Sequence, residues 1–306
     1  MRIRLRQLAL VLASAAVFAA GATGFAAVVP GGGAGTGDVE ALEPEPRPQL
    51  PRGGRQIFPR YRVVAFAGAP QHDGLGALGV GRLDRAVGRL RRQARPYGRG
   101  RRRVLPALDL ISVIALSSPG RGGKYRSRQR STVIRRHLRA ARRARALLIL
   151  DIQPGRSTFP REVRALRRWL REPDVGIALD PEWNMGPRGV PGRRIGYVRG
   201  RTVNVVSGYL ARFVRRHRLP QKLLIVHRFT RPMIRGRIKP RREVAISVNI
   251  DGFGTRAQKR GVYRRLARRR GRIRNGFKVF YKEDTGLMSP RQVMRLRPRP
   301  DVVIYE

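Results

Sequence analysis

Residues 175–183 read VGIALDPEW, and this stretch is the clearest indication of the fold in the sequence. Its first five residues are apolar or small, which is typical of a strand that is covered on both faces. Because side chains alternate along a strand, one face carries two small residues and then two carboxylates: Gly176, Ala178, Asp180 and Glu182. The pattern predicts a strand that leaves room for a ligand beside two acids.

Seven further apolar runs resemble this one, and most of them end in Gly or a polar residue. They are RVVAFAG at 62–68, VLPALD at 104–109, LLILD at 147–151, LLIVH at 223–227, VAISVNID at 244–251, FKVFY at 277–281 and DVVIY at 301–305. Together with residues 175–180 they make eight predicted strands. Runs of this kind are typical of parallel strands that are covered by helices.

Stretches with helical periodicity separate most of these runs. The clearest has apolar residues at helical spacing from Val206 to Val214, and the other faces of these stretches are mostly Arg. Strand–helix alternation predicts an α/β protein in which residues 59–306 form a single (β/α)8 TIM barrel. A doubly wound open sheet is the alternative, but no G-x-G-x-x-G follows the first predicted strand.

The N-terminal segment predicts export. Residues 1–29 join a short basic stretch, MRIRLR, to an uncharged apolar run at 8–29, as in a signal peptide. If uncleaved, residues 8–29 are long enough to act as a membrane anchor. Residues 30–58 are rich in Gly and Pro and are predicted to be a linker. We therefore expect a secreted or extracytoplasmic protein, with membrane contact only through residues 8–29.

The charge of the chain predicts an anionic partner. The sequence has 68 Lys and Arg against 19 Asp and Glu, a net charge of +49, and no Cys. A strongly basic surface attracts polyanions such as cell-wall polymers, although GC-rich codons also favour Arg. The Arg-rich runs lack the interleaved aromatic residues that nucleic-acid binding uses, so a nucleic-acid partner is not expected. The absence of Cys excludes disulfides and thiolate metal sites.

The scarce acids concentrate where a barrel does its chemistry, at the carboxyl ends of its strands. Asp109, Asp151, Asp180 and Asp251 each end a predicted strand, and Glu182 follows the fourth. Two carboxylates close together can divide labour, one staying protonated as a general acid while the other is ionised. Glycosidic cleavage needs that division. The predicted catalytic residues are therefore Asp180, Glu182 and Asp251, with an ion-pair network to Arg as the structural alternative.

Polar and aromatic residues near the same strand ends suit a sugar, because aromatic rings stack on pyranose faces and polar groups bind hydroxyls. The predicted substrate-binding residues are Asp151, Gln153, Trp183, Asn184, His227, Asn249 and Tyr281. Each has a structural alternative: His227 as a satisfied core histidine, Tyr281 and Asn249 as interior packing, and Asp151 as a helix cap.

The D-x-E at the end of the fourth strand resembles the catalytic strand of secreted TIM-barrel muramidases and, more distantly, of chitinase-like hydrolases. The chain also looks like a group of secreted actinobacterial proteins that carry the string LDPEW. The resemblance implies that Glu182 is the acid and Asp180 its assisting carboxylate. The chitinase-like strand has a further Asp where this chain has Ala178, and Pro181 between the carboxylates is unlike either family.

Three functions remain open from the sequence. The first is a glycoside hydrolase-like barrel acting on cell-envelope polysaccharide, and the second is a non-enzymatic protein that binds a wall polymer in the same cleft. The third is a polyanion-binding module that uses Arg-rich faces. No cofactor and no metal site is predicted: Asp180, Glu182, His227 and Asp251 lack the H-x-H or H-E-x-x-H spacing of metal hydrolases.

Overall fold

The fold is a closed barrel of eight parallel strands with helices between them, which confirms the predicted fold class. The structure, a computed structural model, describes residues 47–98, 102–268 and 271–306. The predicted signal or anchor segment, and residues 30–46 of the predicted linker, lie outside these ranges. Among the residues described, no helix is both long and apolar enough to cross a membrane.

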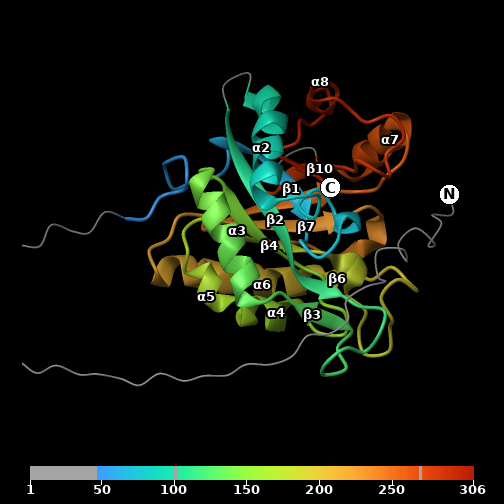
Figure 1. Cartoon of the computed structure of the whole chain (residues 1–306). Helices are drawn as coiled ribbons and strands as arrows, with labels where there is room; N and C mark the ends of the chain where they lie inside the picture. The colour runs from blue at the N-terminus through green and yellow to red at the C-terminus, as the bar shows by residue number, and fades with distance from the viewer. Residues whose placement is uncertain (1–46, 99–101, 269–270) are drawn as a thin grey trace, which may run out of the picture.

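Each predicted strand run corresponds to one strand of the barrel. The barrel strands are β1 (Tyr61–Gly68), β2 (Arg103–Ala115), β4 (Leu147–Ile152), β5 (Val175–Leu179), β7 (Lys222–Arg228), β9 (Val244–Ile250), β10 (Arg274–Val279) and β11 (Val302–Tyr305). The first strand closes the barrel because it pairs in parallel with both β2 and β11. Figure 1 shows the helices arranged around these strands.

Two strand boundaries differ from the prediction. The second strand does not end at Asp109: β2 continues to Ala115, where it pairs in antiparallel fashion with the short strand β3 (Arg126–Arg128). The residues after Asp109, LISVIA, are as apolar as those before it, so nothing local stops the strand. The seventh strand begins at Arg274 and ends at Val279, so Tyr281 lies beyond it.

The helices follow the predicted apolar stripes. They are α2 (Leu83–Ala94), α3 (Ser131–Arg143), α4 (Phe159–Ala165), α5 (Arg167–Leu170), α6 (Gly200–Arg216), α7 (Arg256–Leu266) and α8 (Pro290–Met294). Thr255 and Ser289 begin α7 and α8 with capping boxes, in which a Gln three residues later returns the hydrogen bond. The inward-facing apolar side chains of the helices pack against the outer surface of the barrel, and together they form one large apolar core.

The connection between β7 and β9 contains no α-helix. It holds a 3-10 turn (Arg231–Met233) and the short strand β8 (Ile234–Arg235), which pairs with β6 (Val198–Arg199). Pro232 and Pro240 lack a backbone N–H to donate, and Gly236 adopts a positive φ of 86°, so the segment cannot continue as a helix. The long helix α6 contacts β9 as well as β7.

The end of the barrel at which the strands begin is closed by residues 47–58, the described part of the predicted linker. Leu50 and Ile57 are 3% and 0% exposed and belong to the same apolar cluster as Tyr61 and Leu223, near the starts of their strands. The backbone N–H of Ile57 donates to Gln221 Oε1 at 2.9 Å. These residues pack against the barrel instead of standing apart from it, and the open end is left at the strands' carboxyl termini.

Candidate active site

A cavity of about 220 Å³ opens at the carboxyl end of the strands. Seven of the residues predicted from the sequence line it: Asp151, Gln153, Asp180, Glu182, Trp183, Asp251 and Tyr281. The cavity therefore lies where the chemistry of this fold is normally found.

Glu182 lies at the mouth of the barrel, in a 3-10 turn formed by Pro181–Trp183 immediately after β5. The turn is held in place because Glu182 O accepts a hydrogen bond of 2.7 Å from Gly196 N. Glu182 Oε2 is shielded from solvent and has no hydrogen-bond partner among the residues described. Burial, and then the nearby carboxylates of Asp180 and Asp251, raise the pKa of Glu182 well above its ordinary value. The raised pKa favours the protonated form of this side chain.

Asp180 is oriented by an amide. Gln153 Nε2 donates to Asp180 Oδ2 at 3.2 Å, and Gln153 Oε1 accepts from Ala115 N at 3.1 Å. The backbone contact fixes which end of the Gln153 amide faces the carboxylate. Asp180 Oδ1 is buried without a hydrogen-bond partner in the described part of the chain, and it lies 3.8 Å from His227 Nε2.

Asp251 is held by two neighbours. His227 Nδ1 lies 2.6 Å from Asp251 Oδ2, and Asn249 Nδ2 donates to Asp251 Oδ1 at 2.5 Å. Burial would raise the pKa of Asp251, but His227 and Lys278 together lower it below its ordinary value. Burial likewise opposes protonation of His227, yet Asp251 and Asp180 raise its pKa well above the usual range. In the metal-free chain these shifts favour an ionised Asp251 beside a protonated His227.

Gly276 makes room for this arrangement. It pairs with Asn249 across β9 and β10, and a Cβ at Gly276 would lie 2.0 Å from Asn249 Oδ1. Any larger residue would displace the amide that donates to Asp251.

Two more carboxylates lie inside the barrel, on β2 and β4. Asp109 and Asp151 are 0% and 2% exposed. Burial raises the pKa of Asp109 to about 7 although His227 and Lys278 lower it, and burial followed by Asp180 and Asp109 raises that of Asp151 well above its usual value. Ile152 N donates to Asp151 Oδ1 at 2.8 Å.

Besides His227, Lys278 on β10 carries positive charge inside the barrel. Its ammonium pairs with the carboxylate of Glu306. Burial opposes this charge, but Glu306, Asp251 and Asp180 raise the pKa of Lys278 well above its ordinary value. It is held as an ammonium and is a poor amine nucleophile. Lys282, which follows the seventh predicted strand, is exposed, and its Nζ lies 3.5 Å from Asp73 Oδ2.

Aromatic side chains surround the opening. Trp183, Phe253 and Tyr281 line the cavity together with Phe229 and Phe280. Phe253 and Phe280 meet edge to face at 6.0 Å, and Tyr281, which is 38% exposed, stacks on Tyr305 at 5.4 Å. Together these aromatic side chains offer flat apolar surface to a bound molecule.

Three predicted substrate-binding residues do not line the cavity. Asn184 Nδ2 donates to Tyr197 O at 2.7 Å and so holds the loop after β5. His227 and Asn249 are each 0% exposed and lie behind Asp251. Both contact the carboxylate of Asp251.

Sequence reasoning did not select Asp109, Lys278 or Glu306 as site residues. Asp109 was placed at a strand end, whereas β2 carries it inside the barrel. Alternation along β10 offered a signal for Lys278, because in FKVFY it lies between two apolar residues, Phe277 and Val279, that belong to the outer core. Glu306 directly follows the eighth predicted strand, so its place after a strand end offered a signal of the kind used for Asp180 and Asp251.

Comparison with known proteins adds no relative. No protein-family model, no curated protein and no solved structure matches this chain.

Proposed function

We propose that this protein is a glycoside hydrolase-like enzyme that cleaves cell-envelope polysaccharide, with Glu182 as general acid. The observation that carries the proposal is the state of Glu182. Its carboxyl group lines the cavity, has a buried oxygen without a partner among the described residues, and lies near ionisable neighbours that favour its protonated form. A protonated carboxylic acid at the mouth of a barrel is suited to donate to a leaving oxygen.

The chemistry divides between the two carboxylates of the D-x-E. Glu182 donates its proton to the glycosidic oxygen as the bond from that oxygen to the anomeric carbon breaks. Asp180, held by Gln153, stabilises the positive charge that develops on the sugar ring. Water then adds to the anomeric carbon, and its proton returns the acid to its starting state. Asp251 remains ionised and holds His227 by the hydrogen bond to Nδ1.

The aromatic side chains at the opening and the charge of the chain support the proposal that the substrate is a polymer. Trp183 and Phe253 supply flat faces for sugar rings at the opening. The chain as a whole carries a net charge of +49, which favours residence near an anionic wall. The resemblance of the D-x-E strand to muramidases points in the same direction.

The test is release of soluble sugar from purified cell walls. The full chain is compared with Glu182→Gln and with Glu243→Gln, a matched change at a carboxylate that pairs with Arg215 away from the cavity. We expect release by the parent chain and by Glu243→Gln, and none by Glu182→Gln.

The alternative is a non-enzymatic protein that binds a wall polymer in the same cavity. Its outcome differs: the parent chain and Glu182→Gln both bind the wall, and neither releases sugar. That result would replace the hydrolase proposal.

A further inference from the structure

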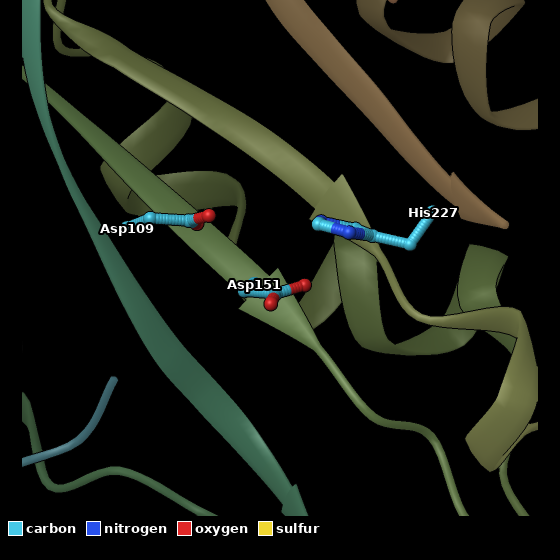
Figure 2. A group of neighbouring side chains, drawn as sticks. All are labelled: Asp109, Asp151 and His227. Atoms are coloured by element: carbon cyan, nitrogen blue, oxygen red, sulfur yellow. The ribbon is translucent and has the colours of Figure 1, made fainter. Parts of the chain in front are cut away.

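A group of buried side chains lies inside the barrel at the base of the cavity. Asp109 on β2, Asp151 on β4 and His227 on β7 each offer one atom that can bind a metal, and these atoms all lie within 4.8 Å of one another. Figure 2 shows that the three side chains point toward one another from three separate strands. Residues distant in sequence are thus brought together by the closure of the barrel.

Three of the oxygen and nitrogen atoms in this group form no hydrogen bond within the described part of the chain, although His227 Nε2 lies 3.8 Å from Asp180 Oδ1. Both carboxylate oxygens of Asp109 and Nε2 of His227 lack a hydrogen-bond partner among the residues that the structure describes. Both side chains are fully buried. Buried polar groups are normally paired, since leaving them unpaired in a dry interior is costly. Oxygen and nitrogen atoms that lack hydrogen bonds and lie this close together inside the barrel indicate that an ion binds among them.

We propose that Asp109, Asp151 and His227 bind one divalent transition-metal cation through two carboxylate oxygens and Nε2 of the imidazole. A mixed set of carboxylate and imidazole donors suits Mn²⁺ or Zn²⁺ better than Ca²⁺ or Mg²⁺, which prefer oxygen alone. Two carboxylates also supply the negative charge that balances a divalent ion in the interior.

The second nitrogen of His227 is arranged as metal-binding histidines usually are. Nδ1 lies 2.6 Å from Asp251 Oδ2 and donates a hydrogen bond to it, so Nε2 is the nitrogen left for the ion. A bound ion would replace the proton that Nε2 carries in the metal-free chain. A carboxylate behind a ligating histidine fixes the ring and increases its basicity. Asn249 in turn holds Asp251, which makes the support continuous.

The cavity gives the ion a route and open coordination positions. Asp151 lines the cavity whereas Asp109 lies behind it, so the ion enters past Asp151. Donor atoms that share an ion at about 2.1 Å lie about 3 to 3.5 Å apart, so small rotations of the carboxylates are needed to close the site. The remaining positions face the cavity, where a water molecule or a substrate oxygen can bind.

The test measures binding of Mn²⁺ and of Zn²⁺ to the full chain after treatment with EDTA, by calorimetry and by metal analysis after dialysis. We expect one ion per chain, with affinity reduced at least 100-fold in Asp109→Asn. In the Mn²⁺ form, pulsed paramagnetic resonance of the unaltered chain should show coupling to one nitrogen, which His227→Gln removes. Circular dichroism establishes that each variant is folded.

Two matched controls change residues outside the group. Asp84→Asn and His72→Gln alter exposed side chains on the surface and should leave both the affinity and the nitrogen coupling unchanged. No saturable binding of either ion would overturn the proposal in favour of protons shared among the carboxylates. A bound Mn²⁺ without nitrogen coupling would also overturn it, because His227 would then not be a ligand. Binding is measured without polysaccharide, so this result is independent of whether Glu182 acts as an acid.

Discussion

His227 and Asp251 form a buried pair at the carboxyl end of the barrel, with His227 Nδ1 2.6 Å from Asp251 Oδ2. Because an ionised carboxylate only accepts hydrogen bonds, the proton lies on Nδ1. The other ring nitrogen then faces Asp180 at 3.8 Å and the carboxylates beneath it. The pair therefore lies in contact with both the carboxylates at the mouth of the barrel and those in its interior.

Removing Asp251 should destabilise the fold. Asp251→Ala leaves the protonated His227 buried without its partner, which costs roughly 3 kcal/mol of unfolding free energy. Urea denaturation at neutral pH measures this, with the exposed Asp84→Ala as the matched control that should change stability by less than about 0.5 kcal/mol. An Asp251→Ala variant as stable as the parent would show that the pair contributes nothing to the fold.

Lys222 should make stability depend on pH. Burial lowers the pKa of Lys222 to about 7, partly offset by Asp174 and Glu172, and its ammonium donates to the backbone oxygen of Glu172. The folded chain releases this proton near pH 7, whereas the unfolded chain keeps it until about pH 10.4. Between these values the unfolded state binds more protons, so Lys222 contributes increasing stability as pH rises.

The effect of Lys222 is isolated by substitution. From pH 7 to pH 9 the unfolding free energy of the parent chain should rise relative to Lys222→Met by about 2 to 3 kcal/mol, since one pKa unit corresponds to about 1.4 kcal/mol. Urea denaturation of both chains at the two pH values measures the difference. A constant gap between the two chains would contradict the lowered pKa.

Glu182→Gln should remove catalysis and leave binding in place. A glutamine keeps the size of the side chain but has no acidic proton to donate, so we expect kcat to fall about 1,000-fold, within the usual range for a general acid. The KM for wall polysaccharide should change little. In the parent chain the rate should also decline as pH rises past the raised pKa of Glu182, because the acid must be protonated. Sugar release over a pH series measures both effects, and unchanged turnover in the variant would reject Glu182 as the acid.

Trp183→Ala should act on binding. The ring lines the cavity directly beside Glu182, and loss of an aromatic face on which a sugar stacks costs about 1 kcal/mol. We expect KM for wall polysaccharide to rise roughly 5- to 10-fold with a smaller change in kcat. Trp169→Phe, on the outer helix α5, is the comparison that changes a tryptophan outside the cavity. An equal loss in both variants would point to a general effect on folding.

The sequence predicted the barrel because its information is local. Each strand is a short apolar run and each helix has a stripe, as in residues 147–151 and along α6. Asp180, Glu182 and Asp251 were selected because they follow such runs directly.

The interior of the site was harder to predict because it depends on register. Asp109 was read as a strand end, and only the continuation of β2 to Ala115 places it beside Asp151 and His227. Lys278 and Glu306 are paired by the closure of the barrel, which no stretch of sequence displays. His227 and Asn249 were predicted to bind substrate, but neither lines the cavity, and both contact Asp251 in the interior.

Residues 47–58 contribute to stability as well as to shape. Ile57 is 0% exposed among the interior residues of the barrel, so Ile57→Ala should cost about 2 to 4 kcal/mol of unfolding free energy. Urea denaturation measures the loss, and Val205→Ala, at a side chain that is 50% exposed on α6, is the control expected to change little. Equal stability of the two variants would mean that the segment packs loosely.

The same segment gives the molecule a polarity. Since the chain enters the barrel at the closed end, anything that precedes residue 47 is attached to the pole opposite the cavity. Arg47, the first described residue, therefore joins the barrel at the end remote from Asp180 and Glu182.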